Sequence, residues 1–179
     1  MPPKVRISKE DIVTAAVALV RKDGVQAINA RNIASALNCS TQPVFSNFAT
    51  MDDLRNAVVE AADALYREYM QRETESGAYP PYKASGMAYI RFAKEEKELF
   101  KLLYMRDRSA ENIPEQTDTG DQMEAMVRGN TGLDGFDAKL FHLEMWAYVH
   151  GIAAMFATGY LDLDWDLVSK MLTDAYQEI

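Results

Sequence analysis

The chain has 179 residues and a net charge of −8, with 48 % hydrophobic and 26 % charged residues, proportions that are ordinary for a folded protein. This length accommodates one domain, or one large and one small domain, with a core that needs no metal or disulfide. The single cysteine, Cys39, excludes an internal disulfide and suits a reducing compartment. Because the longest apolar stretch, residues 145–157, is too short for a bilayer and no signal-peptide pattern occurs, we expect a soluble cytoplasmic protein.

The negative net charge of the whole chain argues against binding to nucleic acid, but the charge is unevenly distributed along the sequence. Residues 1–50 carry six basic and three acidic residues, a net charge of +3, whereas residues 51–179 carry −11. This asymmetry predicts two parts with different partners, a domain at 1–50 and a second domain at 51–179.

Apolar residues recur at helical spacing throughout, and neither strand-like alternation nor an internal repeat occurs. The first helix is expected at 8–22 with Ser8 as its N-terminal cap, and the second at 30–37. A third begins at Ser40, and a long fourth runs from a Thr50 cap to about Glu75. Beyond the proline-containing break at 79–82, further helices are expected at 83–94, 96–106, 119–128, 136–158 and 164–178. A polar loop at 107–118 and a glycine-rich connection at 129–135 separate them.

Residues 30–48 have the arrangement of a helix-turn-helix, with a three-residue turn at 38–40 between two short helices. Asn38 suits this turn, because asparagine tolerates a left-handed backbone. Val44 and Phe48, four residues apart, should face the core. Four short polar side chains then face outward, where they suit base edges and phosphates: Thr41, Gln42, Ser46 and Asn47. Gln42 is the strongest candidate for a base, since its amide can pair with adenine through two hydrogen bonds. The alternative is a helical hairpin without a role in DNA binding, and the basic arm containing Lys4, Arg6 and Lys9 argues against it.

Residues 8–54 resemble the N-terminal DNA-binding domain of the TetR family of transcriptional repressors. The resemblance is carried by Asp23-Gly24 and by the run NARNIASALNCSTQPVFSNFATMDDL at 29–54, where Arg31–Ala34, Ser40, Phe48 and Leu54 match the family pattern without a gap. It implies an all-α fold of about nine helices, in which a three-helix DNA-binding domain is joined by a long helix to a helical ligand-binding and dimerisation domain. The expected DNA contacts are Lys4, Arg6, Arg31, Ser40, Thr41, Gln42, Pro43, Phe45, Ser46, Asn47 and Thr50.

The sequence also departs from the family pattern. Phe45 stands where a phosphate-binding tyrosine is usual, Met51 replaces a common lysine, and Asn47 replaces a histidine or tyrosine. These changes predict DNA binding with a shallow dependence on salt. Free N–H groups at the start of the fourth helix, at Thr50, should compensate in part by holding a phosphate.

Large aromatic and methionine side chains are frequent after residue 80. Any one of them is more simply explained as core, but together they suit an adaptable ligand pocket between helices. The resemblance implies such a pocket for a small molecule, and segment 146–151 is similar to the Trp-x-x-x-His-Gly motif of one family subgroup. The expected lining is Phe92, Phe100, Tyr104, Met123, Met126, Phe141, Met145, Tyr148 and His150, with no metal and no cofactor.

The helix expected at 136–158 carries two apolar stripes, which calls for two packing partners. One stripe is Phe136, Leu140, Leu143, Ala147, His150 and Ala154; the other is Phe141, Met145, Tyr148, Ile152 and Met155. One partner is the core, and the second is either the same chain or another subunit. The resemblance favours a homodimer through the helices at 136–158 and 164–178, with Trp165, Val168, Leu172 and Tyr176 contributing.

The sequence therefore predicts a TetR-like transcriptional repressor that binds palindromic double-stranded operator DNA as a homodimer and is released by a small apolar or amphipathic effector. The alternative is a DNA-binding regulator of the same fold with no small-molecule effector, controlled by a protein partner. An enzyme is disfavoured, because the sequence has no phosphate-binding glycine loop, no Ser/Cys–His pair at motif spacing and no metal cluster.

Overall fold

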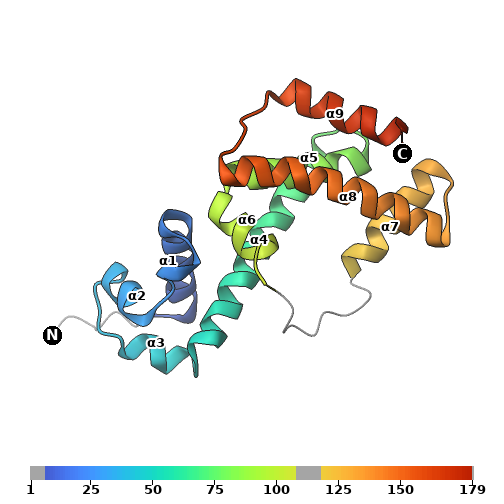
Figure 1. Cartoon of the computed structure of the whole chain (residues 1–179). Helices are drawn as coiled ribbons and strands as arrows, with labels where there is room; N and C mark the ends of the chain where they lie inside the picture. Colours follow the sequence, from blue (N-terminus) through green and yellow to red (C-terminus); the bar gives the residue numbers. More distant parts are fainter. Residues whose placement is uncertain (1–6, 108–117, 179) are drawn as a thin grey trace. The chain divides into compact units, whose positions relative to one another are not determined.

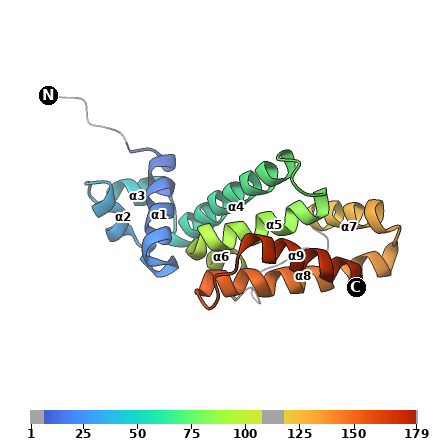
Figure 2. The same cartoon turned by 90° about the horizontal axis from the view of Figure 1, so that it is seen from above.

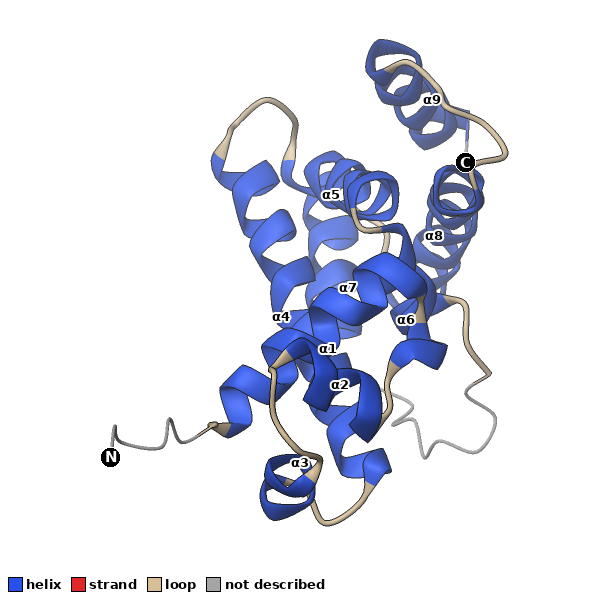
Figure 3. Cartoon of the chain, turned by 90° about the vertical axis from the view of Figure 1, so that its left-hand side faces the viewer, coloured by secondary structure: helices blue, strands red, loops and turns tan. Residues whose placement is uncertain are grey.

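The computed structural model of the chain describes residues 7–107 and 118–178, without the side chains of 118–122 and 178. Over these residues it contains helices and no strand (Figure 3), which confirms the all-α fold. The elements are α1 (Lys9–Asp23), the 3₁₀ helix η1 (Val25–Ala27), α2 (Ala30–Ala36), α3 (Gln42–Asn47), α4 (Met51–Glu75), α5 (Pro81–Glu95), α6 (Lys97–Tyr104), α7 (Asp118–Thr131), α8 (Gly135–Thr158) and α9 (Trp165–Glu178).

The chain folds into two compact units. Unit 1 comprises the described residues of Met1–Leu65 together with Glu96–Arg106, and therefore contains α1 to α3, the first part of α4, and α6 (Figure 1). Unit 2 comprises the described residues of Tyr66–Glu95 and Asp107–Ile179. The long helix α4 thus belongs to both units, and α6 joins the helices at the start of the chain rather than its neighbours in sequence.

Three predicted helix starts are confirmed by side-chain caps. The Ser8 hydroxyl accepts from Asp11 N at 3.0 Å while the Asp11 carboxylate accepts from Ser8 N at 2.8 Å. Hydrogen bonding of the carboxylate to the Ser8 backbone N–H, and to the Ser8 side chain, lowers the pKa of Asp11. Thr50 and Asp53 form the same reciprocal pair at the start of α4. At α9 the Asp164 carboxylate accepts from Asp166 N at 2.8 Å. Each cap satisfies backbone donors that would otherwise have no partner within the helix.

Other helix boundaries differ from the prediction. Ser40 does not cap α3: Thr41 precedes the helix with a helical backbone (φ −72°, ψ −12°) and makes no capping bond. α5 begins at Pro81 rather than 83, because proline lacks only an N–H that the first turn leaves unbonded. α7 continues to Thr131 and α8 begins at Gly135, so the glycine-rich connection expected at 129–135 is shorter than predicted. Nearly all of the polar loop expected at 107–118 lies outside the described residues.

Unit 1 is built around the apolar faces of α1, α2, α3, α4 and α6. Val44 and Phe48 are buried, as the spacing predicted, and Ile33 on α2 has no exposed surface. On α6 Leu99 and Phe100 are also fully buried, in keeping with the contacts of this helix with α1. Because Val44 and Phe48 pack into the core, the opposite face of the short helix α3 is exposed.

Unit 2 has α5 and α8 side by side at its centre, with α7 and α9 packed against this pair (Figures 1 and 2). Gly86 on α5 admits α9 closely, since a Cβ there would lie 3.0 Å from Leu172 Cδ2. Tyr82, Phe141 and Met145 belong to one buried cluster between these helices. No helix among the residues described combines the length and the apolar character that crossing a membrane requires.

Candidate functional site

The turn between α2 and α3 has the backbone that the sequence predicted. Asn38 is left-handed, with φ of 51°, a conformation that asparagine tolerates better than most residues. Cys39 N donates to Ala34 O at 2.9 Å and Asn38 N donates to Ser35 O at 3.2 Å, which fixes the turn to the end of α2. Cys39 itself is half-buried rather than fully buried. The turn redirects the chain so that α3 follows α2 directly.

The free face of α3 carries short polar side chains whose hydrogen bonds differ. Ser46 Oγ donates to Gln42 O at 2.9 Å, and Asn47 Nδ2 donates to Pro43 O at 2.8 Å, so both spend a donor on their own helix. The Gln42 side chain is exposed and has no hydrogen bond to any residue in the described part of the chain. Gln42 therefore keeps its donors and its acceptor for an external partner.

The remaining predicted contact residues surround α3. Arg31 and Ser40 are exposed, whereas Thr41 and Pro43 are half-buried. Phe45 projects from the middle of α3 with 58 % of its surface exposed. Of the basic arm, Lys4 and Arg6 lie outside the described residues, whereas Lys9 is exposed with its Nζ 5.1 Å from the centroid of the Phe48 ring. The surface around α3 is thus polar with one large apolar side chain, and Arg31 and Lys9 bring positive charge to it.

The start of α4 has fewer free hydrogen-bond donors for a phosphate than the sequence predicted. The Asp53 carboxylate accepts from Thr50 N at 2.9 Å and from the Thr50 hydroxyl at 2.8 Å. Arg55, the nearest basic side chain along the helix, donates to Asp52 at 2.8 Å. Because the neighbouring carboxylates take these donors, Thr50 contributes little attraction for an anion.

An ion pair ties α6 to α1 within unit 1. Arg21 Nε and Nη2 donate to the two carboxylate oxygens of Glu96 at 2.8 and 2.7 Å, although the two residues are 75 positions apart. Such a two-point contact fixes orientation as well as distance. The neighbouring residue, Glu95, belongs to unit 2, so the boundary between the units falls between two consecutive carboxylates.

The nine side chains expected to line a ligand pocket are divided between the two units. Phe100 and Tyr104 lie on α6 in unit 1, with ring centroids 5.1 Å apart. In unit 2, Met126 packs against the cluster that holds Phe141 and Met145. The other members are the buried Phe92 and Met123, the exposed Tyr148 and the half-buried His150. Sequence spacing could not assign these residues to separate units.

Both histidines bond to tyrosines of α5. Tyr82 Oη lies 3.1 Å from His142 Nδ1, and Tyr89 Oη lies 2.8 Å from His150 Nδ1. Burial lowers the pKa of each histidine and raises the pKa of each tyrosine, because it disfavours the charged forms. The ring of Trp146 stacks on His150 at 5.3 Å. These histidines are neutral packing partners, and none of the described His, Cys, Asp and Glu residues form a cluster suited to a metal ion.

The two apolar stripes of α8 have different environments. Phe141, Met145 and Ile152 are buried in the chain, although Tyr148 and Met155 of the same stripe are exposed. The other stripe faces out: its exposed members include Phe136, 77 % exposed, and Leu140, Leu143 and Ala147.

The α9 residues expected at a subunit contact also make contacts within the chain. Val168 and Leu172 are buried, the Trp165 ring stacks on Phe156 at 5.8 Å, and Tyr176 meets Phe141 at 5.3 Å. The opposite face of α9 exposes Leu167. Val168 and Leu172 are therefore unavailable for a subunit contact, because α9 needs that face to cover α5 and α8. Trp165 and Tyr176 are half-buried, and their part in a subunit contact stays a prediction.

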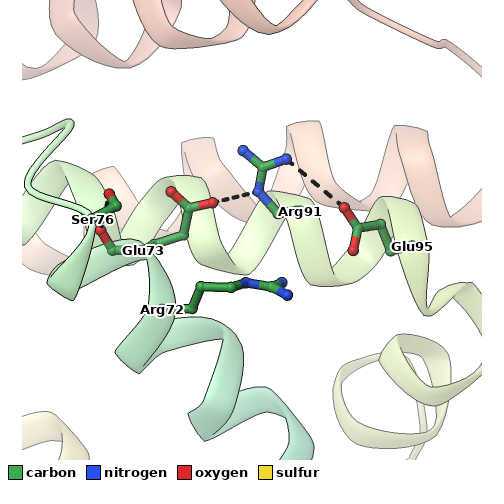
Figure 4. Close-up of a pocket in the computed structure, with 5 residues that line it drawn as sticks. All are labelled: Arg72, Glu73, Ser76, Arg91 and Glu95. Atoms are coloured by element: carbon green, nitrogen blue, oxygen red, sulfur yellow. Dashed lines mark hydrogen bonds and ion pairs between the residues drawn. The ribbon is translucent and has the colours of Figure 1, made fainter.

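A polar pocket that the sequence did not reveal lies between α4 and α5. It has a volume of about 340 Å³ and is lined by Arg72, Glu73, Ser76, Arg91 and Glu95 (Figure 4). In the sequence these residues resemble the solvated charges of two surface helices. Only the packing of α4 on α5 brings them together, and none of the nine expected pocket residues is among them.

Comparison with known proteins gives one family and a set of similar folds. The model of the tetracyclin repressor-like C-terminal domain matches residues 82–175, just over half of the chain. A TetR-like transcriptional regulator from Rhodococcus sp. RHA1 is 15 % identical, with a TM-score of 0.71, over 99 % of this chain and 96 % of that one. No curated protein matches the chain at a significant level.

Two further solved structures carry functional names. SmeT, the repressor of the Stenotrophomonas maltophilia multidrug efflux pump SmeDEF, is 22 % identical with a TM-score of 0.57, over 96 % of this chain and 91 % of its own. The multidrug binding protein EbrR, complexed with malachite green, is 16 % identical with a TM-score of 0.64, over 97 % of this chain and 98 % of its own. At these identities the similarity is evidence of the fold alone.

Proposed function

This chain belongs to the TetR family of transcription regulators, and we propose that it is a repressor that binds palindromic operator DNA as a homodimer and responds to a small-molecule effector. Members of this family are regulators rather than enzymes. Three parts of the proposal have separate support: the reading helix, the contact between two copies, and the effector.

The observation that carries the proposal is the free face of α3. Gln42 is exposed with its amide uncommitted, while Val44 and Phe48 on the opposite face anchor the helix in unit 1. A helix anchored in this way enters the major groove, and a glutamine amide matches the donor and acceptor of adenine. We assign Gln42 to base reading.

The other contacts hold the helix in place on the backbone of the duplex. We assign phosphate contacts to Arg31, Ser40 and Thr41 and to the acceptors of Ser46 and Asn47. From the sequence we expect Lys4 and Arg6 of the basic arm to add two more. Pro43 and Phe45 pack on sugars, and Thr50 contributes weakly because Asp53 takes its N–H. The affinity for non-specific DNA is accordingly modest.

The exposed stripe of α8 supports a homodimer. Phe136, Leu140 and Leu143 present an apolar surface that a monomer would leave in water. Gly151 continues the face, and a Cβ there would meet nothing within 4 Å, so its open side is available to a second copy. A two-fold contact here, joined by Leu167 of α9, presents two reading helices to a palindrome at a spacing of about 34 Å or a multiple of it.

The effector is proposed to be apolar or amphipathic. The names of EbrR and SmeT associate this fold with multidrug binding and with control of a multidrug pump. Among the nine expected pocket residues, Met126, Phe141 and Met145 remain the strongest ligand candidates, because they gather in one adaptable cluster. A coupling free energy of about 1–3 kcal/mol between the effector and DNA would change operator affinity about 5- to 150-fold.

Selection of bound duplexes from a random DNA pool tests the proposed function. The wild-type chain should enrich a palindrome, and Gln42→Ala should relax the preference at one base pair of each half-site. The control is Gln177→Ala, the same change at an exposed position of α9, which should enrich the wild-type palindrome. Failure of the wild type to enrich any sequence, or an identical palindrome from Gln42→Ala, would refute the assignment.

A further inference from the structure

The pocket between α4 and α5 contains one arginine that is already paired with carboxylates. Arg91 Nε donates to Glu73 Oε1, and Arg91 Nη1 lies 3.8 Å from Glu95 Oε1 (Figure 4). Glu73 is only 7 % exposed, and the Arg91 guanidinium also stacks 4.5 Å from the centroid of the Trp165 ring. This ion pair is therefore fixed from three helices, and its charges compensate each other.

The second arginine of the pocket is held by an aromatic ring and makes no direct ion pair within the described residues. The Arg72 guanidinium lies 4.4 Å from the centroid of the Tyr69 ring, and Tyr69 Oη donates to Glu95 at 2.8 Å. Tyr69 is buried, so it forms a fixed platform under the cation. Within the described residues Arg72 has no ion pair and no hydrogen bond from its side chain. The ring covers one face of the guanidinium, so the N–H donors at its edge are available to a ligand in the pocket that Arg72 lines.

A stacked arginine with a free edge selects a particular chemistry. Two parallel N–H groups fit the two oxygens of a carboxylate, and a side chain that is already fixed loses little entropy when the ligand binds. The carboxylates of Glu73 and Glu95 balance Arg72 and Arg91, so the lining is neutral as a whole. A singly charged anion then leaves one excess negative charge, whereas a doubly charged phosphate leaves two. The Ser76 hydroxyl is already bonded to Glu73 O at 2.7 Å.

We propose that the pocket lined by Arg72, Glu73, Ser76, Arg91 and Glu95 binds a small monocarboxylate, with Arg72 as its anchor. The volume of about 340 Å³ lies in the range of ligand pockets, roughly 300–1,000 Å³, and admits a carboxylate with a ring or a short chain. This site shares no residue with the apolar cluster of Met126, Phe141 and Met145. As a binding site it is independent of DNA recognition; as an effector site it rests on the proposed function.

Isothermal titration calorimetry with sodium benzoate tests the site. At about pH 7 and constant ionic strength, the wild-type chain should bind benzoate saturably. Benzamide, which has the same shape without the charge, should bind at least tenfold more weakly, and inorganic phosphate should bind more weakly than benzoate. Arg72→Gln should lower the affinity for benzoate at least tenfold. Arg72→Lys keeps the positive charge but loses the two parallel N–H donors, so its affinity should lie between those of the wild type and Arg72→Gln.

The matched control is Arg128→Gln, which removes the same charge from α7 of the same unit, where Arg128 pairs with Asp134 at 3.1 Å. It should bind benzoate like the wild type. Thermal unfolding of each variant establishes that it folds, which is expected because Arg72 is exposed. Absence of benzoate binding by the wild type, equal binding by Arg72→Gln, or equal binding of benzamide would overturn the site, whatever the outcome of the DNA selection.

Discussion

The free face of α3 in unit 1 and the free face of α8 in unit 2 differ in chemistry. Helix α3 exposes the amide of Gln42 and the hydroxyl of Ser46, whereas α8 exposes Phe136 and Leu143. Exposed polar side chains are well solvated by water, and they can form hydrogen bonds to a base edge instead. An exposed apolar stripe, in contrast, gains free energy only when another apolar surface covers it. What each helix leaves outside, rather than what it buries, therefore indicates its partner.

The largest change in stability is expected when a buried phenylalanine of unit 1, rather than an exposed one, is replaced. Phe100→Ala should lower the free energy of unfolding by about 3–5 kcal/mol, because the ring is fully buried on α6 and its removal leaves a cavity. The control, Phe45→Ala on α3, should leave stability nearly unchanged and weaken DNA binding. Denaturant unfolding followed by circular dichroism measures both. A loss below about 1 kcal/mol for Phe100→Ala would mean that this ring lines an open site instead of the core.

The next effect concerns the α8 face. Leu143→Glu should weaken self-association by about two orders of magnitude, because the two-fold contact places the new carboxylate in the apolar interface twice. Leu161→Glu, an equivalent change at an exposed leucine between α8 and α9, is the control and should remain dimeric. Sedimentation equilibrium reports the association constant. A Leu143→Glu chain that still associates like the wild type would place the subunit contact elsewhere.

A smaller effect is expected where the α3 surface lacks cations. Each phosphate contact by a lysine adds about 0.9 to the steepness of a plot of log K against log salt. The wild type should give a shallow slope, and Met51→Lys should steepen it by about one per chain. Gln177→Lys adds the same charge at the end of α9 and should leave the slope unchanged. A wild-type slope as steep as that of a heavily basic DNA-binding protein would contradict the account of this surface.

The smallest expected change is a loss of stability at low pH, caused by the two histidines of unit 2. Burial lowers the pKa of His142 and of His150 in the folded chain, whereas in the unfolded chain both titrate near the ordinary value of about 6.5. Below 6.5 the unfolded chain therefore binds more protons, and stability falls as the pH drops through this range. Thermal unfolding at about pH 7.5 and 5.5 measures the loss. A His142→Gln/His150→Gln variant should lose less stability between the two pH values, and an unchanged loss would contradict the burial argument.

Sequence alone predicted the parts of the molecule whose signals are local. The capping pairs of Ser8 and Thr50, the left-handed Asn38 and the inward Val44 and Phe48 each depend on residues within four positions of one another. Such short-range patterns fix backbone geometry before any tertiary contact forms. For this reason the helix-turn-helix could be predicted in detail.

The parts that could not be predicted depend on contacts between distant segments. The Arg21–Glu96 pair joins residues 75 positions apart and accompanies the packing of α6 in unit 1, which no periodicity reveals. The two stripes of α8 are both apolar, so only the packing of α5 decides that Phe141 faces inward. The same applies to the polar pocket, because the position of Arg72 above Tyr69 depends on the contact of α4 with α5.

The central claim, that α3 reads DNA while α8 joins two copies, is tested most directly by native mass spectrometry of the chain with its selected duplex. We expect a complex of one duplex with two chains of 20.1 kDa each, formed on the palindrome and absent on a duplex of the same composition with the half-sites scrambled. A complex that holds a single chain, or one that forms equally on the scrambled duplex, would contradict it.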